Sequence, residues 1–323
     1  MSKLDLSAVY ARHDVVFVTP SWRGDFQRFQ LLRASMRAAG LGGVPHYAVV
    51  QTEDLALFRT GAPEVRYLST AEVLPEEVEY RRVRFLLRTP SRRMQLFKRS
   101  LYKRLGWFPD ANFYGWHTQQ LVKLGLGRHL PHAVLVSIDS DVIITRPVPV
   151  DEFVRGNDVA LFEQRGTLQQ PLKRPGWYGE ACRLLDRPWP RQAGEETFNY
   201  VTHPFAFRAQ TLRELLDWLE QRYQRPWWQA MLAQPLGGWS EFMTYGAFVR
   251  LHQDSRGTFT AVANQACRWL ETPEQRANAA EVIRSIFDNL DVYYLVIQAD
   301  HHLRFTLRDY GPLVCAELER RSA

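Results

Sequence analysis

The sequence has few cysteines and no long apolar run. Its three cysteines, Cys182, Cys267 and Cys315, lie far apart and form no metal-binding spacing. Because nothing in this pattern indicates a disulfide framework, we expect the chain to remain in a reducing, cytoplasmic compartment. No apolar run approaches the roughly 20 residues of a membrane-spanning helix. The first residues also lack the apolar core of a signal peptide, so we expect no export.

Acidic residues are missing from one long segment, residues 81–104. This segment contains ten basic residues and no acid: Arg81, Arg82, Arg84, Arg88, Arg92, Arg93, Lys98, Arg99, Lys103 and Arg104. Such a run indicates contact with phosphates or with an anionic membrane face. A solvated basic helix face is the alternative. We expect no nucleic-acid partner, because no recognisable nucleic-acid-binding module accompanies the run.

The 323 residues are enough for a sizeable core, and the apolar and charged fractions, 46% and 24%, are those of a globular protein. Short apolar runs alternate with helical patterns along the chain. Strands are predicted at 14–19, 45–50, 65–68, 133–138, 142–144, 159–163, 198–207, 258–263 and 292–297; helices at 25–39, 115–124, 177–185, 208–223 and 273–288; loops at 164–175 and 186–196. This alternation predicts an α/β fold with a mostly parallel central sheet flanked by helices.

Polar side chains follow the first predicted strand. In open α/β sheets the ligand lies beyond the carboxyl ends of the strands, so Thr19, Ser21 and Asp25 are candidate contacts for a nucleotide. The alternative is a cluster that caps the helix over 25–39.

The stretch 132–147 is the centre of the pattern. Its apolar strand is followed by Asp139, Ser140 and Asp141, and then by a second apolar run. Two carboxylates this close repel each other. They favour a hard divalent cation such as Mg²⁺ or Mn²⁺, which prefers oxygen ligands and keeps positions open for phosphate. The alternative is a surface turn with two solvated acids.

A strand, an Asp-x-Asp and a short strand in this order resemble the metal motif of glycosyltransferases with the GT-A fold. The resemblance implies one Rossmann-like GT-A domain over residues 1–323, in which a metal on Asp139 and Asp141 bridges the diphosphate of a nucleotide-sugar. Asp139 and Ser140 are accordingly assigned to nucleotide-sugar binding. It divides the chain into a nucleotide-sugar-binding half (13–147), an acceptor-binding half (148–303) and a C-terminal tail (304–323). It also implies that a histidine near the C-terminus, His301 or His302, completes the metal shell.

The segment 115–124 reads Gly-Trp-His-Thr-Gln-Gln-Leu-Val-Lys-Leu. It resembles a helix of a poorly characterised bacterial polysaccharide-type glycosyltransferase family (DUF6492-like). The resemblance, together with the amide and ammonium chemistry, implies that Gln119, Gln120 and Lys123 clamp sugar hydroxyls and phosphate. Lys123 would offset charge on the leaving diphosphate. An amphipathic helix with an exposed lysine is the alternative.

The segment 238–246 resembles a Ser-Glu-aromatic-x-x-Tyr-Gly motif of the same transferases. Ser240 is expected to cap a helix, which places Glu241 in the first turn. The resemblance implies that Glu241 is the base that deprotonates an acceptor hydroxyl, if the reaction inverts configuration. In a retaining reaction it would orient a sugar hydroxyl. The alternative is an acid that stabilises the helix dipole.

Three further residues are candidate contacts. His203 emerges from an aromatic, strand-like segment, and Trp239 offers a flat face to a sugar ring, so both are assigned to the acceptor. Arg93, in the basic run, is assigned to the nucleotide-sugar.

The sequence therefore predicts a metal-dependent glycosyltransferase that moves a sugar from a nucleotide-sugar to a hydroxyl of a glycan or glycolipid acceptor. The resemblance favours bacterial cell-surface polysaccharide synthesis, in the cytoplasm or peripherally on the inner membrane face. A sugar-1-phosphate nucleotidylyltransferase is an alternative, but residues 19–24 are not the Gly-rich loop it would show after its first strand. A non-catalytic carbohydrate- or polyanion-binding protein is another. The nucleotide, sugar, linkage, stereochemistry and oligomeric state stay open.

Overall fold

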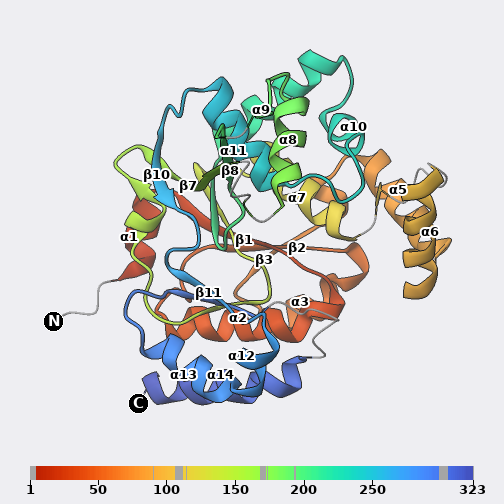
Figure 1. The fold of residues 1–323 in the computed structure, drawn as a ribbon. Helices are drawn as coiled ribbons and strands as arrows, with labels where there is room; N and C mark the ends of the chain where they lie inside the picture. The colour runs from red at the N-terminus through yellow and green to blue at the C-terminus, as the bar shows by residue number, and fades with distance from the viewer. Residues whose placement is uncertain are drawn as a thin grey trace.

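The computed structural model describes residues 5–89, 91–105, 112–113, 115–167, 172, 174–192, 194–297 and 305–322 (Figure 1). Its largest sheet has the strand order β3-β2-β1-β4-β9. The strands are β1 (Val15–Pro20), β2 (His46–Val50), β3 (Arg66–Ser69), β4 (Val134–Ser137) and β9 (Phe205–Arg208). The first four run parallel and only β9 is antiparallel. The predicted α/β class with a mostly parallel central sheet is confirmed.

Helices cover both faces of this sheet, which is why its inner strands are continuous apolar runs. In β1, Val16 and Val18 pack into the core formed with α7 (Gly115–His129), α9 (Ala209–Tyr223) and α11 (Glu241–His252). Val15 and Phe17 point the other way, into the core formed with α2 (Phe26–Ala38). The alternation of a strand thus feeds two cores at once.

A second sheet has the order β10-β7-β6, and β8 pairs with the far end of β7. Its strands are β6 (Val154–Arg155), β7 (Asp158–Thr167), β8 (Glu196–Asn199) and β10 (Thr258–Val262). Two expectations were wrong here. Residues 164–167 are strand rather than loop, because they pair with β8. The aromatic segment 198–207 is two strands, β8 and β9, that belong to different sheets.

A third sheet, β11-β12-β5, explains how the two predicted acids are displayed. It consists of β11 (Cys267–Trp269), β12 (Tyr294–Val296) and β5 (Val142–Ile144). The chain therefore leaves the central sheet after β4 and enters another sheet at β5. Asp139 and Asp141 lie at that junction, where the Ile297 N–H donates to the Asp141 carbonyl at 3.0 Å.

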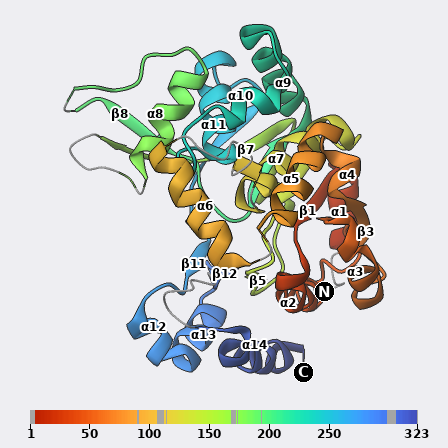
Figure 2. The same ribbon diagram turned by 90° about the vertical axis from the view of Figure 1, so that its right-hand side faces the viewer.

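Three helices close the C-terminal end: α12 (Pro273–Ala277), α13 (Ala279–Asp288) and α14 (Leu307–Ser322). The single helix predicted over 273–288 is interrupted at Asn278. The predicted C-terminal tail contains α14, which packs against α13 and α2 and buries Tyr310, Val314 and Leu318 (Figures 1 and 2). This segment is therefore part of the packed structure.

The remaining helices are α1 (Leu6–Arg12), α3 (Leu55–Gly61), α4 (Thr70–Val73), α5 (Glu76–Leu87), α6 (Arg92–Leu105), α8 (Pro175–Leu184) and α10 (Trp227–Leu232). Within the described ranges, every helix is too short or too polar to cross a bilayer.

A buried chain of hydrogen bonds ties the central strands together. Arg33 Nη1 lies 3.1 Å from His46 Nδ1, and arginine can only donate, so the neutral imidazole carries its proton on Nε2. Nε2 then donates to Thr19 Oγ1 at 2.8 Å, and the Thr19 hydroxyl donates to the Ile138 carbonyl at 2.7 Å. Burial, and then the charge of Arg33, hold the pKa of His46 well below its ordinary value. These hydrogen bonds fix Ile138, which follows the end of β4 and directly precedes Asp139.

Replacing Thr19 by valine should test this chain. Thr19→Val keeps the side-chain shape but leaves the buried His46 N–H and the Ile138 carbonyl unpaired. We expect the free energy of unfolding to fall by about 1–3 kcal/mol in urea titrations. Thr60→Val, on the exposed face of α3, is the matched control and should change it by less than about 0.5 kcal/mol. Equal effects of the two substitutions would contradict the proposed role of Thr19.

Candidate active site

A cavity of about 480 Å³ opens beyond the carboxyl end of β4. It brings together predicted residues from distant parts of the chain. Those that line it are Gln119, Gln120, Lys123, Asp139, Asp141, His203 and Glu241. They come from α7, the β4–β5 junction, the segment before β9, and α11. This is the position that an open α/β sheet gives to its ligand site.

Lys123 forms ion pairs with two carboxylates of the cavity wall. Its Nζ lies 2.9 Å from Asp139 Oδ1 and 2.9 Å from Glu241 Oε1. The side chains of Lys123 and Glu241 are only 5% and 4% exposed, whereas that of Asp139 is 31% exposed. Burial alone would lower the pKa of Lys123, but the two carboxylates outweigh it and raise that pKa. The ammonium is therefore charged, and it joins α7, β4 and α11.

Gln120 sets the beginning of α11. Its Oε1 accepts a hydrogen bond from the Glu241 N–H at 3.1 Å. Ser240 occupies the predicted N-cap position, but its side chain makes no capping bond, and its hydroxyl donates to Glu241 Oε2 at 3.1 Å instead. The expectation that Ser240 caps the helix was thus right for the position and wrong for the bond, because α7 supplies the acceptor.

The two aspartates differ in their electrostatic surroundings. Burial would raise the pKa of Asp139, but Lys123 and then His203 outweigh it and lower that pKa. The pKa of Asp141 is raised to about 7, first by burial and then by the charges of Asp139 and Asp25. Among the described residues, Asp141 forms no salt bridge. The negative charge of Asp139 is therefore balanced by Lys123, whereas that of Asp141 has no ion-pair partner among the described residues.

The donor set suits a hard divalent cation. Two carboxylates at a cavity edge can hold Mg²⁺ or Mn²⁺ and leave positions for water or phosphate. In the part of the chain that the structure describes, no group of three or more His, Cys, Asp or Glu side chains is arranged to hold a metal. The predicted ligands His301 and His302 lie outside the described residues.

His203 lies beside the acid pair. Its Nε2 is 3.7 Å from Asp139 Oδ2, and the residue is 9% exposed. Burial lowers its pKa, although Asp139 opposes the shift, so the imidazole is neutral. Its Nδ1 has no hydrogen-bond partner among the described residues, and neither has the buried Nε2 of Gln120. Two residues that line the cavity thus each carry a buried polar atom without a partner among the described residues.

Four of the predicted contacts lie beside the cavity but do not line it. Thr19 is fully buried in the hydrogen-bond chain described above. The hydroxyls of Ser21 and Ser140 lie 2.9 Å apart. Asp25 accepts from Trp22 Nε1 at 2.8 Å and pairs with Arg28 at 2.7 Å. Burial nonetheless raises its pKa. Thr19 and Ser21 thus bond to Ile138 and Ser140, the two residues on either side of Asp139.

Trp239 and Arg93 are not brought to the cavity either. Trp239 is fully buried and stacks on His117, with ring centroids 4.9 Å apart. The prediction that it contacts an acceptor therefore finds no support in its position. Arg93 is exposed on α6 and does not line the cavity.

Sequence reasoning missed the aromatic wall of the cavity. Trp116 and Trp177 lie with ring centroids 5.6 Å apart, and the Arg174 guanidinium carbon lies 4.3 Å from the Trp177 ring centroid. Trp269 and Glu271 also line the cavity. Trp116 lies inside the motif segment 115–124, and this position could have indicated that it lines the site. The others lie on segments whose meeting depends on tertiary packing.

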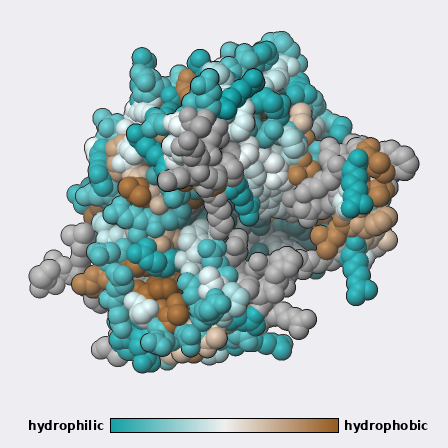
Figure 3. Space-filling model, in the orientation of Figure 1, coloured by the Kyte–Doolittle hydropathy of each residue, from teal (hydrophilic) through white to brown (hydrophobic). Residues whose placement is uncertain are grey.

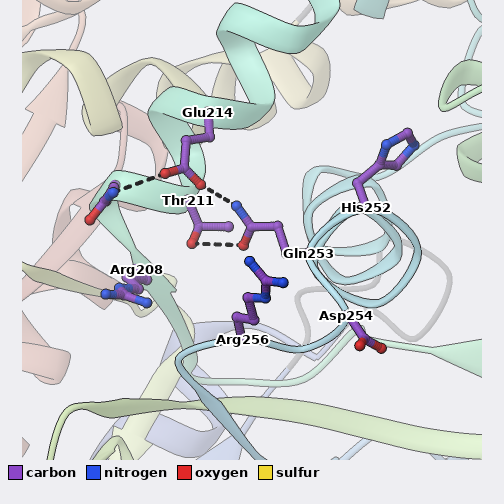
Figure 4. A pocket seen from close by; sticks show the side chains of 8 residues that line it. Arg208, Thr211, Glu214, His252, Gln253, Asp254 and Arg256 are labelled. Carbon is purple, nitrogen blue, oxygen red and sulfur yellow. Dashed lines mark hydrogen bonds between the residues drawn. The ribbon is translucent and has the colours of Figure 1, made fainter.

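A second, more polar cavity of about 340 Å³ lies beside α9 and the end of α11 (Figure 4). Its side chains are bonded to one another: Glu214 accepts from Gln253, and Thr211 donates to Gln253 Oε1 at 3.2 Å. None of the predicted site residues lines it, so the cavity at β4 is the candidate active site.

Residues 15–304 match DUF6492, described as a family of unknown function. Mouse xyloside xylosyltransferase 1, in its apo form, is similar in structure with a TM-score of 0.44 and 10% identity, over 90% of this chain and 99% of that one. The galactosyltransferase LgtC, in complex with donor and acceptor sugar analogues, has a TM-score of 0.41 and 10% identity, over 93% and 95%. No curated protein matches the chain.

Removing the Lys123 charge should destabilise the protein in a pH-dependent way. In Lys123→Met the buried carboxylates of Asp139 and Glu241 lose their shared cation, so the free energy of unfolding should fall by about 3 kcal/mol near pH 7.5. The loss should shrink towards about pH 5.5. Without Lys123, burial raises the pKa of Asp139 above its unfolded value, so the folded state takes up a proton as the pH falls.

Urea titrations at both pH values, compared with the wild type, measure this difference. Lys98→Met, on α6, is the control and should show a small loss that does not depend on pH. A loss in Lys123→Met that stays constant across this range would contradict the buried ion-pair network.

Proposed function

The chain belongs to the DUF6492 family, and we propose that it is a glycosyltransferase that moves a sugar from a nucleotide-sugar to a hydroxyl of a glycan or glycolipid acceptor. One observation carries the proposal. An acid pair suited to a hard cation and a buried Lys123–Glu241 pair face a single cavity that also has an aromatic wall. Cation-bound phosphate, a proton acceptor and a flat apolar face are what sugar transfer needs.

The donor would bind at the acid pair. Asp141, with Asp139, would hold Mg²⁺ or Mn²⁺, which supplies positive charge to the leaving diphosphate. Lys123 is already balanced by Asp139 and Glu241, so we assign it to holding these two carboxylates rather than to a direct phosphate contact. Gln119, which lines the same wall one helical turn before Lys123, is placed to bond a sugar hydroxyl.

The acceptor would lie between Glu241 and the aromatic wall. Its hydroxyl oxygen attacks the anomeric carbon, the bond from that carbon to the diphosphate oxygen breaks, and the proton passes to the carboxylate of Glu241. Lys123 and Ser240 hold that carboxylate from both oxygens. The faces of Trp116 and Trp177 would carry the sugar ring of the acceptor.

We place the reaction in cell-surface polysaccharide synthesis, at the cytoplasmic face of the membrane, with a glycan or a lipid-linked glycan as acceptor. This placement rests on the motif resemblance of residues 115–124 and 238–246. The exposed apolar and basic side chains of α6 add support for the membrane.

Donor binding should depend on Asp141. With Mn²⁺, a cognate UDP-, GDP- or CMP-sugar at about 100 times its dissociation constant should raise the melting temperature by about 5 °C. Asp141→Asn should abolish the Mn²⁺-dependent part of the shift. Asp151 is an exposed aspartate in the 3₁₀ turn Val150–Glu152. Asp151→Asn is the control and should keep the Mn²⁺-dependent shift. No stabilisation by any of these donors would argue strongly against the proposed function.

Turnover should depend on Glu241. Glu241→Gln keeps the bond to Lys123 but cannot take a proton, so release of the nucleotide should slow by about 100-fold or more. The donor-induced thermal shift should persist. Glu271→Gln, which lines the same cavity, is the matched control and should retain turnover within about tenfold. Undiminished turnover in Glu241→Gln would remove it as the base, and a wild type that binds without turnover would indicate a binding protein.

A further inference from the structure

The α5–α6 pair exposes large apolar side chains. Leu87 at the end of α5 is 78% exposed, and Phe97 and Leu105 on α6 are 61% and 57% exposed. The pair stands at the edge of the molecule, at the right in Figure 1. Brown, hydrophobic surface lies over it beside teal, hydrophilic surface in Figure 3. Such exposure on one projecting element requires an explanation, because isolated exposed apolar residues are scattered over a surface rather than gathered.

On α6 the apolar side chains form a stripe. Met94, Phe97, Leu101 and Leu105 follow one another at spacings of three, four and four residues, so they share one face of the helix. Met94, Phe97 and Leu105 are exposed, and Leu101 is partly buried. The helix is held from the α5 end, where Gln95 Nε2 donates to the Thr89 carbonyl at 3.2 Å.

The sequence of α6 contains several basic residues and no acid. Arg93 and Arg104 flank the stripe and form no salt bridge among the described residues. On α5, by contrast, Arg81 pairs with Glu77 at 2.6 Å. Because no acid lies between residues 81 and 104, the excess positive charge is concentrated on α6 and on the turn before it.

We propose that α6 lies in the headgroup layer of an anionic bilayer, with its apolar stripe at the acyl boundary and its basic side chains on lipid phosphates. A basic helix with bulky apolar side chains on one face is the form that interfacial helices take. Anionic lipids add attraction for each nearby Lys or Arg.

Other occupants fit less well. A second copy of the chain, related by twofold symmetry, would bring two basic helices together without acids to pair them. A nucleic acid would meet the positive charge, but Phe97 and Leu105 would stay in water. The membrane is the partner that matches both the charge and the apolar stripe. The proposal does not depend on the transferase activity.

Flotation of the full-length protein with vesicles tests it. We expect binding to vesicles with about 30% phosphatidylglycerol and about tenfold weaker binding to pure phosphatidylcholine. Phe97→Ser with Leu105→Ser should reduce binding about tenfold, and Arg93→Gln with Arg104→Gln should reduce both the binding and its salt dependence. Because these side chains are exposed, melting temperatures should be unchanged.

The control replaces two exposed leucines elsewhere, Leu57→Ser with Leu290→Ser, and should bind as the wild type does. Equal binding to both vesicle types, or binding that survives Phe97→Ser with Leu105→Ser, would overturn the proposal. Light scattering is the second measurement. A dimer that dissociates on these substitutions would assign the stripe to contact between copies instead.

Discussion

The buried ion pair network around Lys123 is the interaction on which the site depends. An ammonium that is 5% exposed is tolerated only because two carboxylates lie 2.9 Å away. These carboxylates come from the end of β4 and the first turn of α11, and Lys123 comes from the middle of α7. The electrostatic requirement of one side chain therefore sets the relative position of three elements, and with it the shape of the cavity.

The same network makes the two aspartates unequal. Asp139 forms an ion pair with Lys123 through one carboxylate oxygen. Asp141 lies at the junction of two sheets and forms no salt bridge among the described residues. Hydrogen bonds hold the backbone on both sides of the acid pair. β4 is fixed through Thr19 and His46, and the Asp141 carbonyl is bonded to Ile297. A rigid frame thus holds a carboxylate whose pKa is raised to about 7.

Much of this could be predicted from local patterns. The strands at 14–19 and 133–138 are continuous apolar runs because helices cover both faces of the sheet. Because these strands are parallel neighbours, the residues that follow their carboxyl ends lie at the same edge of the sheet. Local patterns do not tell whether an aromatic side chain faces a cavity or the core. Trp116 and Trp239 both stand in motif segments, yet the first lines the cavity and the second stacks on His117 in the core. That difference is decided by contacts between distant segments.

The charge of the cavity wall gives a second reason to expect a cation at the acid pair. Among the residues that the structure describes, four carboxylates line it, from Asp139, Asp141, Glu241 and Glu271, against two cationic side chains, Lys123 and Arg174. A nucleotide diphosphate brings further negative charge, and in a partly desolvated site like charges repel strongly. A divalent ion on the acid pair would neutralise the wall. If the proposed donor binds in this cavity, the charge of the described wall favours metal-dependent binding.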